Sequence, residues 1–473
     1  MKRTTSLVWG TVAWLVGLGF AATYDLHVHL ALIVAALFMA GMGIWRLRGR
    51  MKLVAILLLG FVLGLVRGHM YIADQRWYDV QDIVGQHATI SGRVSDEPGW
   101  SKEGFFEFYM SELIVDGRNT PGTLKVKSQV GNVLEGQHVE VVGKVGRALG
   151  RAPAQIWYAK VTLLDHHQPY PIRFKQILSM GLASALSREQ AGFVRGLLFG
   201  SRSGISSALE ADLRVDGLSH IIAVSGYNLT IIVGALTIMV RRKSLNTLLI
   251  VLTAIGLYVI MTGFAASILR AALMSVVLLV CRYTRRKVDL PAALAVTVFA
   301  MTTWSPRYLL QDIGWQLSVL ALVGVLVVAP RIAALRDRQI SSWKQIVLDI
   351  LIVSLAAHLA TAPLIAYYFG TFSLIAPIAN LTILPAVPAL MFAGLLAATF
   401  GVINAEIAFA LMWPLRQAIM VIEHIISWFA RWPLAELVPG DVSIVGVCLS
   451  YAVLALFAVL YSAKSRNIRS KMV

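Results

Sequence analysis

Long apolar segments separated by short polar loops make up most of the chain. Three such segments open the sequence, and each is near the roughly 20 residues that a helix needs to cross a bilayer. Nine more follow the polar middle region. The pattern therefore predicts about twelve transmembrane helices, at 7–24, 30–45, 53–66, 217–240, 245–263, 266–281, 290–304, 313–330, 345–368, 373–397, 405–428 and 442–462.

The middle region, from about residue 76 to 168, has a different pattern, in which polar and apolar residues alternate. Turn-forming Gly, Asn and Asp residues separate short runs of this alternation, as expected for β-strands. Five short strands in about 90 residues predict a small barrel of the OB type. We expect the strands at His87–Val94, Phe105–Met110, Thr123–Ser128, His138–Val145 and Gln155–Leu164.

Two amphipathic helices, Phe174–Ala185 and Gln190–Phe199, are expected to lie at the membrane surface after the barrel. The predicted fold is a mainly α polytopic membrane protein with about 12 transmembrane helices and a small extracytoplasmic OB-like β-barrel inserted after the third. The expected domains are a three-helix unit (1–70), the β-domain (71–168), the interfacial helices (169–206), the main transmembrane domain (207–463) and a basic cytoplasmic tail (464–473).

Composition supports a lipid environment. Hydrophobic residues make up 58% of the chain and charged residues 14%, with a mean hydropathy of +0.72; soluble domains carry about 25% charged residues. The net charge is +17, but Lys and Arg gather in alternate loops, such as 241–243 and 285–287. The positive-inside rule then places both termini in the cytoplasm and the β-domain outside. Topology explains much of the charge, so the charge alone is weak support for nucleic-acid binding.

Several motifs are more specific than hydropathy. LFGSRSGI at 198–205 is followed by GLSHIIAVSG at 217–226, SILRAALM at 267–274 and DIGWQLS at 312–318. Pro363, IANL at 378–381 and Pro385 come next. In this order the motifs resemble the signature of the ComEC family of competence proteins. The resemblance implies a channel that takes up single-stranded DNA during natural transformation, while the complementary strand is degraded outside.

The resemblance also implies partners: single-stranded DNA, membrane lipids, a separate nuclease, a surface DNA receptor and a cytoplasmic motor ATPase. Many family members carry a metallo-β-lactamase-like nuclease domain, but this sequence has no HxHxDH motif. His27, His29 and 165–167 lack further ligands at metal-binding spacing. We therefore expect no enzyme activity, metal or cofactor. There is no GxxxxGK[ST] loop either, so a motor or the membrane potential must supply the energy.

Polar residues within the apolar segments are the candidates for lining a channel, because polar groups at membrane depth must face protein or water. The Ser-Gly pair at 225–226 either breaks a helix or lies on a continuous one. The alternative role for these groups is helix–helix contact, and Arg270 could instead reach the outer interface or pair with Asp312. The channel-lining candidates are Ser219, His220, Ser225, Gly226, Asn228, Arg270, Gln316 and Asn380.

The β-domain combines basic and aromatic residues, as OB folds do where they hold single strands. The same aromatics could instead fill the barrel core, and the domain could bind a protein partner. The DNA-binding candidates are Lys125, Lys127, Lys144, Arg147, Arg151, Trp100, Phe105 and Tyr109. Two other functions stay open: a small-molecule or ion transporter, which also uses broken helices, and a membrane assembly protein.

Overall fold

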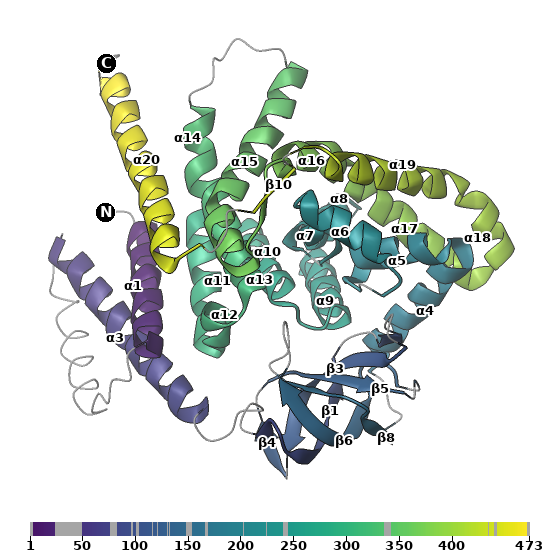
Figure 1. The fold of residues 1–473 in the computed structure, drawn as a ribbon. Helices are drawn as coiled ribbons and strands as arrows, with labels where there is room; N and C mark the ends of the chain where they lie inside the picture. Colours follow the sequence, from purple (N-terminus) through teal and green to yellow (C-terminus); the bar gives the residue numbers. More distant parts are fainter. Residues whose placement is uncertain are drawn as a thin grey trace.

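The structure is a computed structural model that combines a helical body with a small β-barrel at one end (Figure 1). It describes residues 3–23, 50–75, 83–95, 98–100, 104–115, 117–120, 122–129, 131, 133–147, 154–165, 169–201, 203–223, 225–239, 245–334, 342–433, 435–438 and 442–470. The second predicted span, 30–45, lies outside the described residues.

Two N-terminal helices, α1 (Arg3–Thr23) and α3 (Arg50–Gln75), cross in close contact. Glycines make this approach possible: a Cβ on Gly17 would lie 2.0 Å from the carbonyl oxygen of Phe61. Small residues at such crossings are typical of membrane helices, where backbone packing replaces the hydrophobic effect. Trp14 of α1 donates a hydrogen bond to the hydroxyl of Thr302 at 3.0 Å, which ties the pair to the helical body.

The barrel has five principal strand positions, in the order β1, β3, β5, β7, β6, and closes where β6 pairs with β1. The β5–β7 pair is parallel and the others are antiparallel. Alternate residues such as Ile90, Phe108 and Ile156 point inward and form its core. The strands are β1 (His87–Val94), β2 (Gly99–Trp100), β3 (Phe106–Val115), β4 (Arg118–Thr120), β5 (Leu124–Ser128), β6 (His138–Arg147), β7 (Ala154–Ile156) and β8 (Lys160–Asp165).

Four of the five predicted strands are confirmed, with boundary shifts of a few residues at most ends, and the fifth is divided in two. The largest differences are a longer β3 and the division of the predicted strand Gln155–Leu164 into β7 and β8. Tyr158 causes a local interruption there, because its φ of 54° is incompatible with extended backbone.

The helical body follows the barrel. Its elements are α4 (Tyr170–Ala185), α5 (Arg188–Phe199), α6 (Ser207–Val215), α7 (Ser219–Ile222), α8 (Gly226–Met239), α9 (Leu245–Met261), α10 (Ala266–Tyr283), α11 (Leu290–Trp304), α12 (Arg307–Leu310), α13 (Ile313–Val323), a π-turn (Gly324–Val328), α14 (Ala329–Ala333), α15 (Ser342–Phe369), α16 (Ala376–Ile383), a 3₁₀ turn (Leu384–Ala386), α17 (Val387–Ile403), α18 (Ala405–Leu411), α19 (Trp413–Ala430) and α20 (Ile444–Ser470). The short strands β9 (Phe372–Ser373) and β10 (Glu436–Leu437) pair with each other.

Five helical segments among the described residues are long and apolar enough to cross a membrane, or six if α18 and α19, bent by 57°, form one span. Further apolar helices are shorter, such as α9 and α11. The structure therefore supports a mostly helical membrane protein, but it does not confirm the predicted number of twelve spans. One predicted span, 217–240, is divided between α7 and α8.

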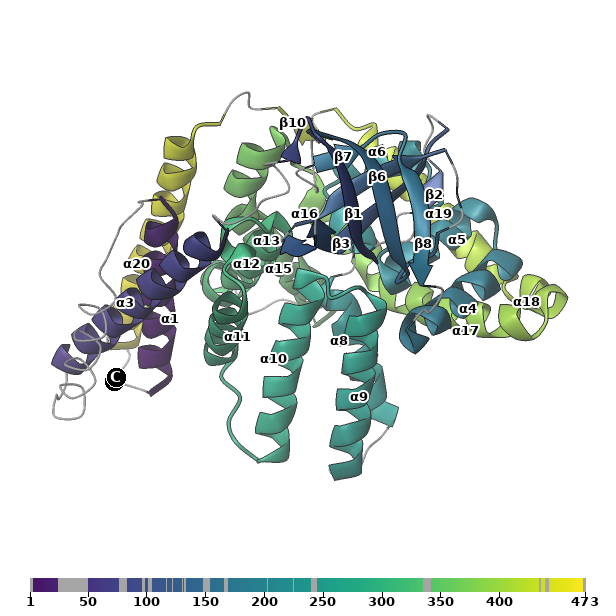
Figure 2. The same cartoon turned by 90° about the horizontal axis from the view of Figure 1, so that it is seen from below.

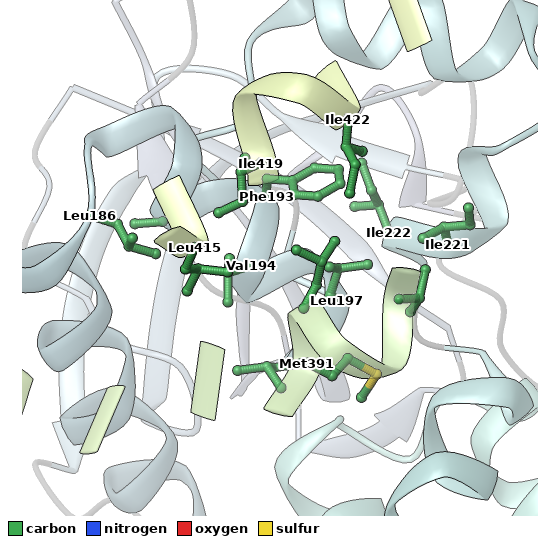
Figure 3. Close-up of a cluster of buried hydrophobic side chains, with 14 of the residues drawn as sticks. Leu186, Phe193, Val194, Leu197, Ile221, Ile222, Met391, Leu415, Ile419 and Ile422 are labelled. Atoms are coloured by element: carbon green, nitrogen blue, oxygen red, sulfur yellow. The ribbon is translucent and has the colours of Figure 1, made fainter. Parts of the chain in front are cut away.

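The largest apolar core surrounds α5, which is buried along most of its length. Figure 3 shows side chains from α5, α7, α17 and α19 meeting in this cluster. The capping box of Ser187 and Gln190 starts α5, and Gly200, with a φ of 74°, ends it. The two helices expected after the barrel are thus confirmed as α4 and α5. Their position relative to the membrane surface stays a prediction.

Candidate functional site at a helix break

The predicted span 217–240 begins at a glycine turn and is interrupted once, between α7 and α8. Gly217, with a φ of 69°, separates α6 from α7, and Ala223, with a ψ of 121°, ends α7 after one turn. Only glycine fits the first position, because a Cβ there would lie 2.7 Å from the Cβ of Ala376. Ile221 and Ile222 hold the single turn in the apolar cluster around α5 (Figure 3). The broken-helix alternative is therefore confirmed, and we refer to 217–228 as the helix break.

Asn228 of α8 and Tyr258 of α9 each donate a hydrogen bond to the C-terminal end of α5. The Asn228 amide donates from Nδ2 to the carbonyl oxygen of Leu197 at 2.9 Å, and the Tyr258 hydroxyl donates to that of Leu198 at 3.0 Å. Carbonyls in the last turn of a helix lack intrahelical donors. The Ser225 hydroxyl donates to Asn228 Oδ1 at 3.2 Å. Asn228 is 1% exposed, so its polar atoms face protein.

Ser219 and His220 lie on the exposed side of α7. The Nδ1 atom of His220 donates to the carbonyl oxygen of Gly217 at 3.0 Å, which orients the imidazole. The break thus offers one imidazole and one hydroxyl that the protein leaves exposed.

Arg270 of α10 lies against the start of α8. A Cβ on Gly226 would be 3.2 Å from Arg270 Nη2 and 3.0 Å from the Cβ of Ala271. Arg270 is 8% exposed. The expected pair with Asp312 is not formed: Asp312 instead caps α13 by accepting a hydrogen bond from the Trp315 backbone at 2.8 Å.

Gln316 and Asn380 are the candidates that lie on other helices. Gln316 donates from Nε2 to the carbonyl oxygen of Leu309 at 2.7 Å, so it joins α13 to the preceding turn. Asn380 donates to the Ser354 hydroxyl at 3.0 Å, and its Oδ1 is buried without a hydrogen-bond partner. Asn380 is one turn along α16 from Ala376, which touches Gly217. Six of the channel-lining candidates therefore lie together at the break: Ser219, His220, Ser225, Gly226, Asn228 and Arg270. Asn380 lies on an adjoining helix, and Gln316 lies apart from the break. That any of them lines a channel stays a prediction.

On the barrel, two of the candidate lysines share a carboxylate. Lys125 and Lys127 contact the two oxygens of Glu107 at 2.8 and 3.0 Å. Burial alone would raise the pKa of Glu107, but its hydrogen bonds with both lysines lower it below the ordinary value. Part of the positive charge expected for DNA binding is thus neutralised within the domain.

An aromatic cluster covers the same face of the barrel. The Phe105 ring meets Trp157 and Tyr158 edge-on, at centroid distances of 5.9 and 5.1 Å. Lys127 Nζ lies 3.9 Å from the Trp157 ring centroid. Trp157 and Tyr158 are 40% and 66% exposed. Sequence reasoning missed these two aromatics, although they lie together inside a predicted strand.

The other barrel candidates occupy defined positions where the structure describes them. Tyr109 faces Lys125 across the β3–β5 pair, and Lys144 is exposed on β6. Arg147 is exposed at the end of β6, while the backbone of Trp100 pairs with that of Phe106. Arg151 lies outside the described residues. Within the described part of the chain, no three His, Cys, Asp or Glu side chains gather in a way that would hold a metal ion.

The helix break lies in the part of the chain that matches a known protein family. The sequence profile of the family described as "Competence protein" matches residues 197–464, more than half of the chain. ComE operon protein 3 of Bacillus subtilis (strain 168) is 30% identical over 207 residues, which is 43% of this chain and 25% of that protein. The aligned segment therefore spans about a quarter of the relative. No solved structure matches the chain.

Proposed function

The chain belongs to the competence protein family, and from this membership and the helix break we propose that it forms the channel through which single-stranded DNA crosses the bacterial cytoplasmic membrane. Family membership gives the chain a role in competence DNA uptake. The passage of DNA through this chain is our proposal.

The observation that carries the proposal is the helix break. Irregular backbone at membrane depth is stable only inside protein or along a wet cavity, and transporters place such breaks at their binding sites. A path for a polyanion needs hydrogen-bond donors without a ring of carboxylates. The break supplies imidazole, hydroxyl and a nearby guanidinium, and residues 217–228 include no Asp or Glu.

We further propose that the β-domain is an OB fold that holds the incoming strand outside the membrane. Support comes from its strand order, with a parallel β5–β7 pair in an otherwise antiparallel closed barrel. The exposed rings of Trp157 and Tyr158 offer stacking surfaces on one face of the barrel, and the buried Lys127, paired with Glu107, supports the Trp157 ring. Base–aromatic stacking tolerates every sequence, as a general uptake system requires.

The family role also leads us to propose a separate nuclease, a surface DNA receptor and a cytoplasmic motor ATPase as partners. The sequence contains no GxxxxGK[ST] loop, so the chain itself offers no such nucleotide site.

The proposal is tested by deleting the gene and scoring two steps separately. We expect the deletion strain to bind labelled DNA at its surface, but to lose nuclease-protected intracellular DNA and transformants, and both to return when the chain is supplied in trans. A deletion strain that transforms at the parental frequency would contradict the proposed function.

A further inference from the structure

Among the residues that the structure describes, no carboxylate pairs with the buried cation of Arg270. Its side chain is 8% exposed, its Nε has no hydrogen-bond partner, and Nη1 contacts only the weak acceptor Sδ of Met274, at 3.8 Å. The ion pairs among the described residues involve other cations: Arg93, Lys125, Lys127 and Lys175. Burying an unpaired charge is unfavourable, so this position favours an anion that the chain does not itself provide.

The guanidinium points at the N-terminus of a helix. A Cβ on Gly226, the first residue of α8, would be 3.2 Å from Arg270 Nη2. Helix α8 has 14 residues, so its first turn carries the positive end of a full helix dipole. The first N–H groups of a helix lack intrahelical acceptors, and here that of Asn228 donates to the Ser225 carbonyl oxygen at 3.1 Å. The Ser225 hydroxyl is directed to the Asn228 side chain. Two positive features therefore adjoin one another.

From this juxtaposition we propose that Arg270 and the N-terminus of α8 bind a phosphodiester group of the DNA strand in transit. The inference rests on the proposed function and adds which group of the DNA the helix break binds. A guanidinium and helix N–H groups are the two donors that most often recognise phosphate. Each phosphate would be held at this point by charge, without regard to base sequence.

The location favours nucleic acid over a lipid headgroup. Arg270 lies among the buried residues Ile268, Ala271 and Ala272, in the packing between α8, α9 and α10. Its guanidinium is directed to the helix break and not to an exposed face of α10. A lipid phosphate would reach the guanidinium only by entering the bundle, whereas in the proposed channel the strand itself passes through the bundle beside the break.

The test measures binding to the full chain in nanodiscs of zwitterionic lipid, with a fluorescent single-stranded oligonucleotide as the probe. We expect Arg270→Gln to weaken binding by about tenfold, which corresponds to the loss of one charged hydrogen-bond contact. The slope of log affinity against log salt should fall by about 0.7, the value for one phosphate of a single strand. Arg270→Lys should keep the slope. Arg282→Gln, at the exposed other end of the same helix, is the matched control. It should keep both the wild-type affinity and the wild-type salt slope.

Several results would overturn the inference. One is an inserted Arg270→Gln protein whose affinity and salt slope match those of the wild type. Another is a wild-type site occupied only when anionic lipid is present, which would assign it to headgroups. If neither Arg270 variant accumulates, modification of wild-type Arg270 by phenylglyoxal decides: the oligonucleotide should protect Arg270, and absence of protection contradicts the proposal. Failure of the proposed function is distinct, because the wild type would then bind no oligonucleotide and the deletion strain would still transform.

Discussion

Individual residues at the helix break differ in whether the protein satisfies their polar groups. Asn228 and Tyr258 donate to the last carbonyls of α5 and stabilise the fold. Asp216, which directly precedes Gly217, is fully buried and neither of its oxygens has a hydrogen-bond partner. Burial, and then the neighbouring Asp212, raise the pKa of Asp216 to about 7 from its ordinary 3.8.

This carboxyl predicts a pH dependence of stability. The unfolded group loses its proton near pH 3.8 and the folded group near 7, so stability falls as the pH rises across this interval. Asp216→Asn should therefore unfold at a temperature several degrees higher than the wild type at pH 8 and show little difference at pH 4, as measured by thermal unfolding in detergent. Asp212→Asn should gain less, because it removes only the smaller cause of the raised pKa of Asp216 and gives up the hydrogen bond that Asp212 accepts from Ser427 at 2.7 Å. An unchanged pH profile in Asp216→Asn would contradict this account.

Gly226 provides a second test at the residue scale. A leucine there would occupy the space beside Arg270 and Ala271. We expect Gly226→Leu to insert and accumulate but to reduce transformation by at least about tenfold, the effect of a barrier increase of 1.4 kcal/mol. Gly234→Leu, on the same helix with open space around its Cβ, should transform normally. A stable Gly226→Leu protein that transforms at the parental frequency rules the break out as a narrow part of the channel.

At the scale of elements, local patterns predicted the strands and most helices. Alternation fixed the barrel strands because each has one buried face, as in β1 and β3. The break at Ala223 could not be deduced from hydropathy, since 217–240 is apolar enough for a continuous helix. Hydropathy also did not reveal that Asp312 caps α13 and leaves Arg270 without the pairing considered for it. Trp157 and Tyr158 were missed because their exposure depends on the interruption between β7 and β8.

The joint between the barrel and α4 is held by a buried ion pair. Lys175 Nζ and Glu135 Oε2 are 2.7 Å apart, and both side chains are 6% exposed. Lys175→Met should destabilise this joint by about 3–5 kcal/mol, because it leaves a buried carboxylate uncompensated. Glu135→Leu combined with Lys175→Met should restore most of the loss. Protease sensitivity of the barrel reports the effect, and Lys160→Met on exposed β8 is the control. A single variant as resistant as the wild type would contradict it.

At the scale of the whole molecule, the barrel lies at one end of the helical body (Figures 1 and 2). The turn between α9 and α10 brings Gly263 next to the carbonyl oxygen of Ser95 in the barrel. A Cβ added to Gly263 would lie 3.6 Å from that oxygen. Arg270 lies in the second turn of α10 from that end. A strand held on the barrel would therefore be close to the helix break.

Topology gives a whole-molecule prediction. In a Cys281→Ser, Cys448→Ser background, a cysteine replacing Lys160 on the barrel should react with an impermeant thiol reagent in intact cells. A cysteine replacing exposed Lys287, in a basic loop, should react only after lysis. Labelling in the opposite order would overturn the orientation of the chain.

The most direct test of DNA passage is photo-crosslinking during uptake. Tyr227, 41% exposed at the start of α8, is replaced by a photoreactive phenylalanine, and Leu449, 62% exposed on α20, is the control. Cells that are importing labelled DNA with a bulky block at one end are irradiated, and DNA bound to the chain is measured. Our account predicts crosslinks at position 227 and none at 449. Normal uptake without crosslinks at 227, or equal crosslinking at both positions, would contradict a channel through the helix break.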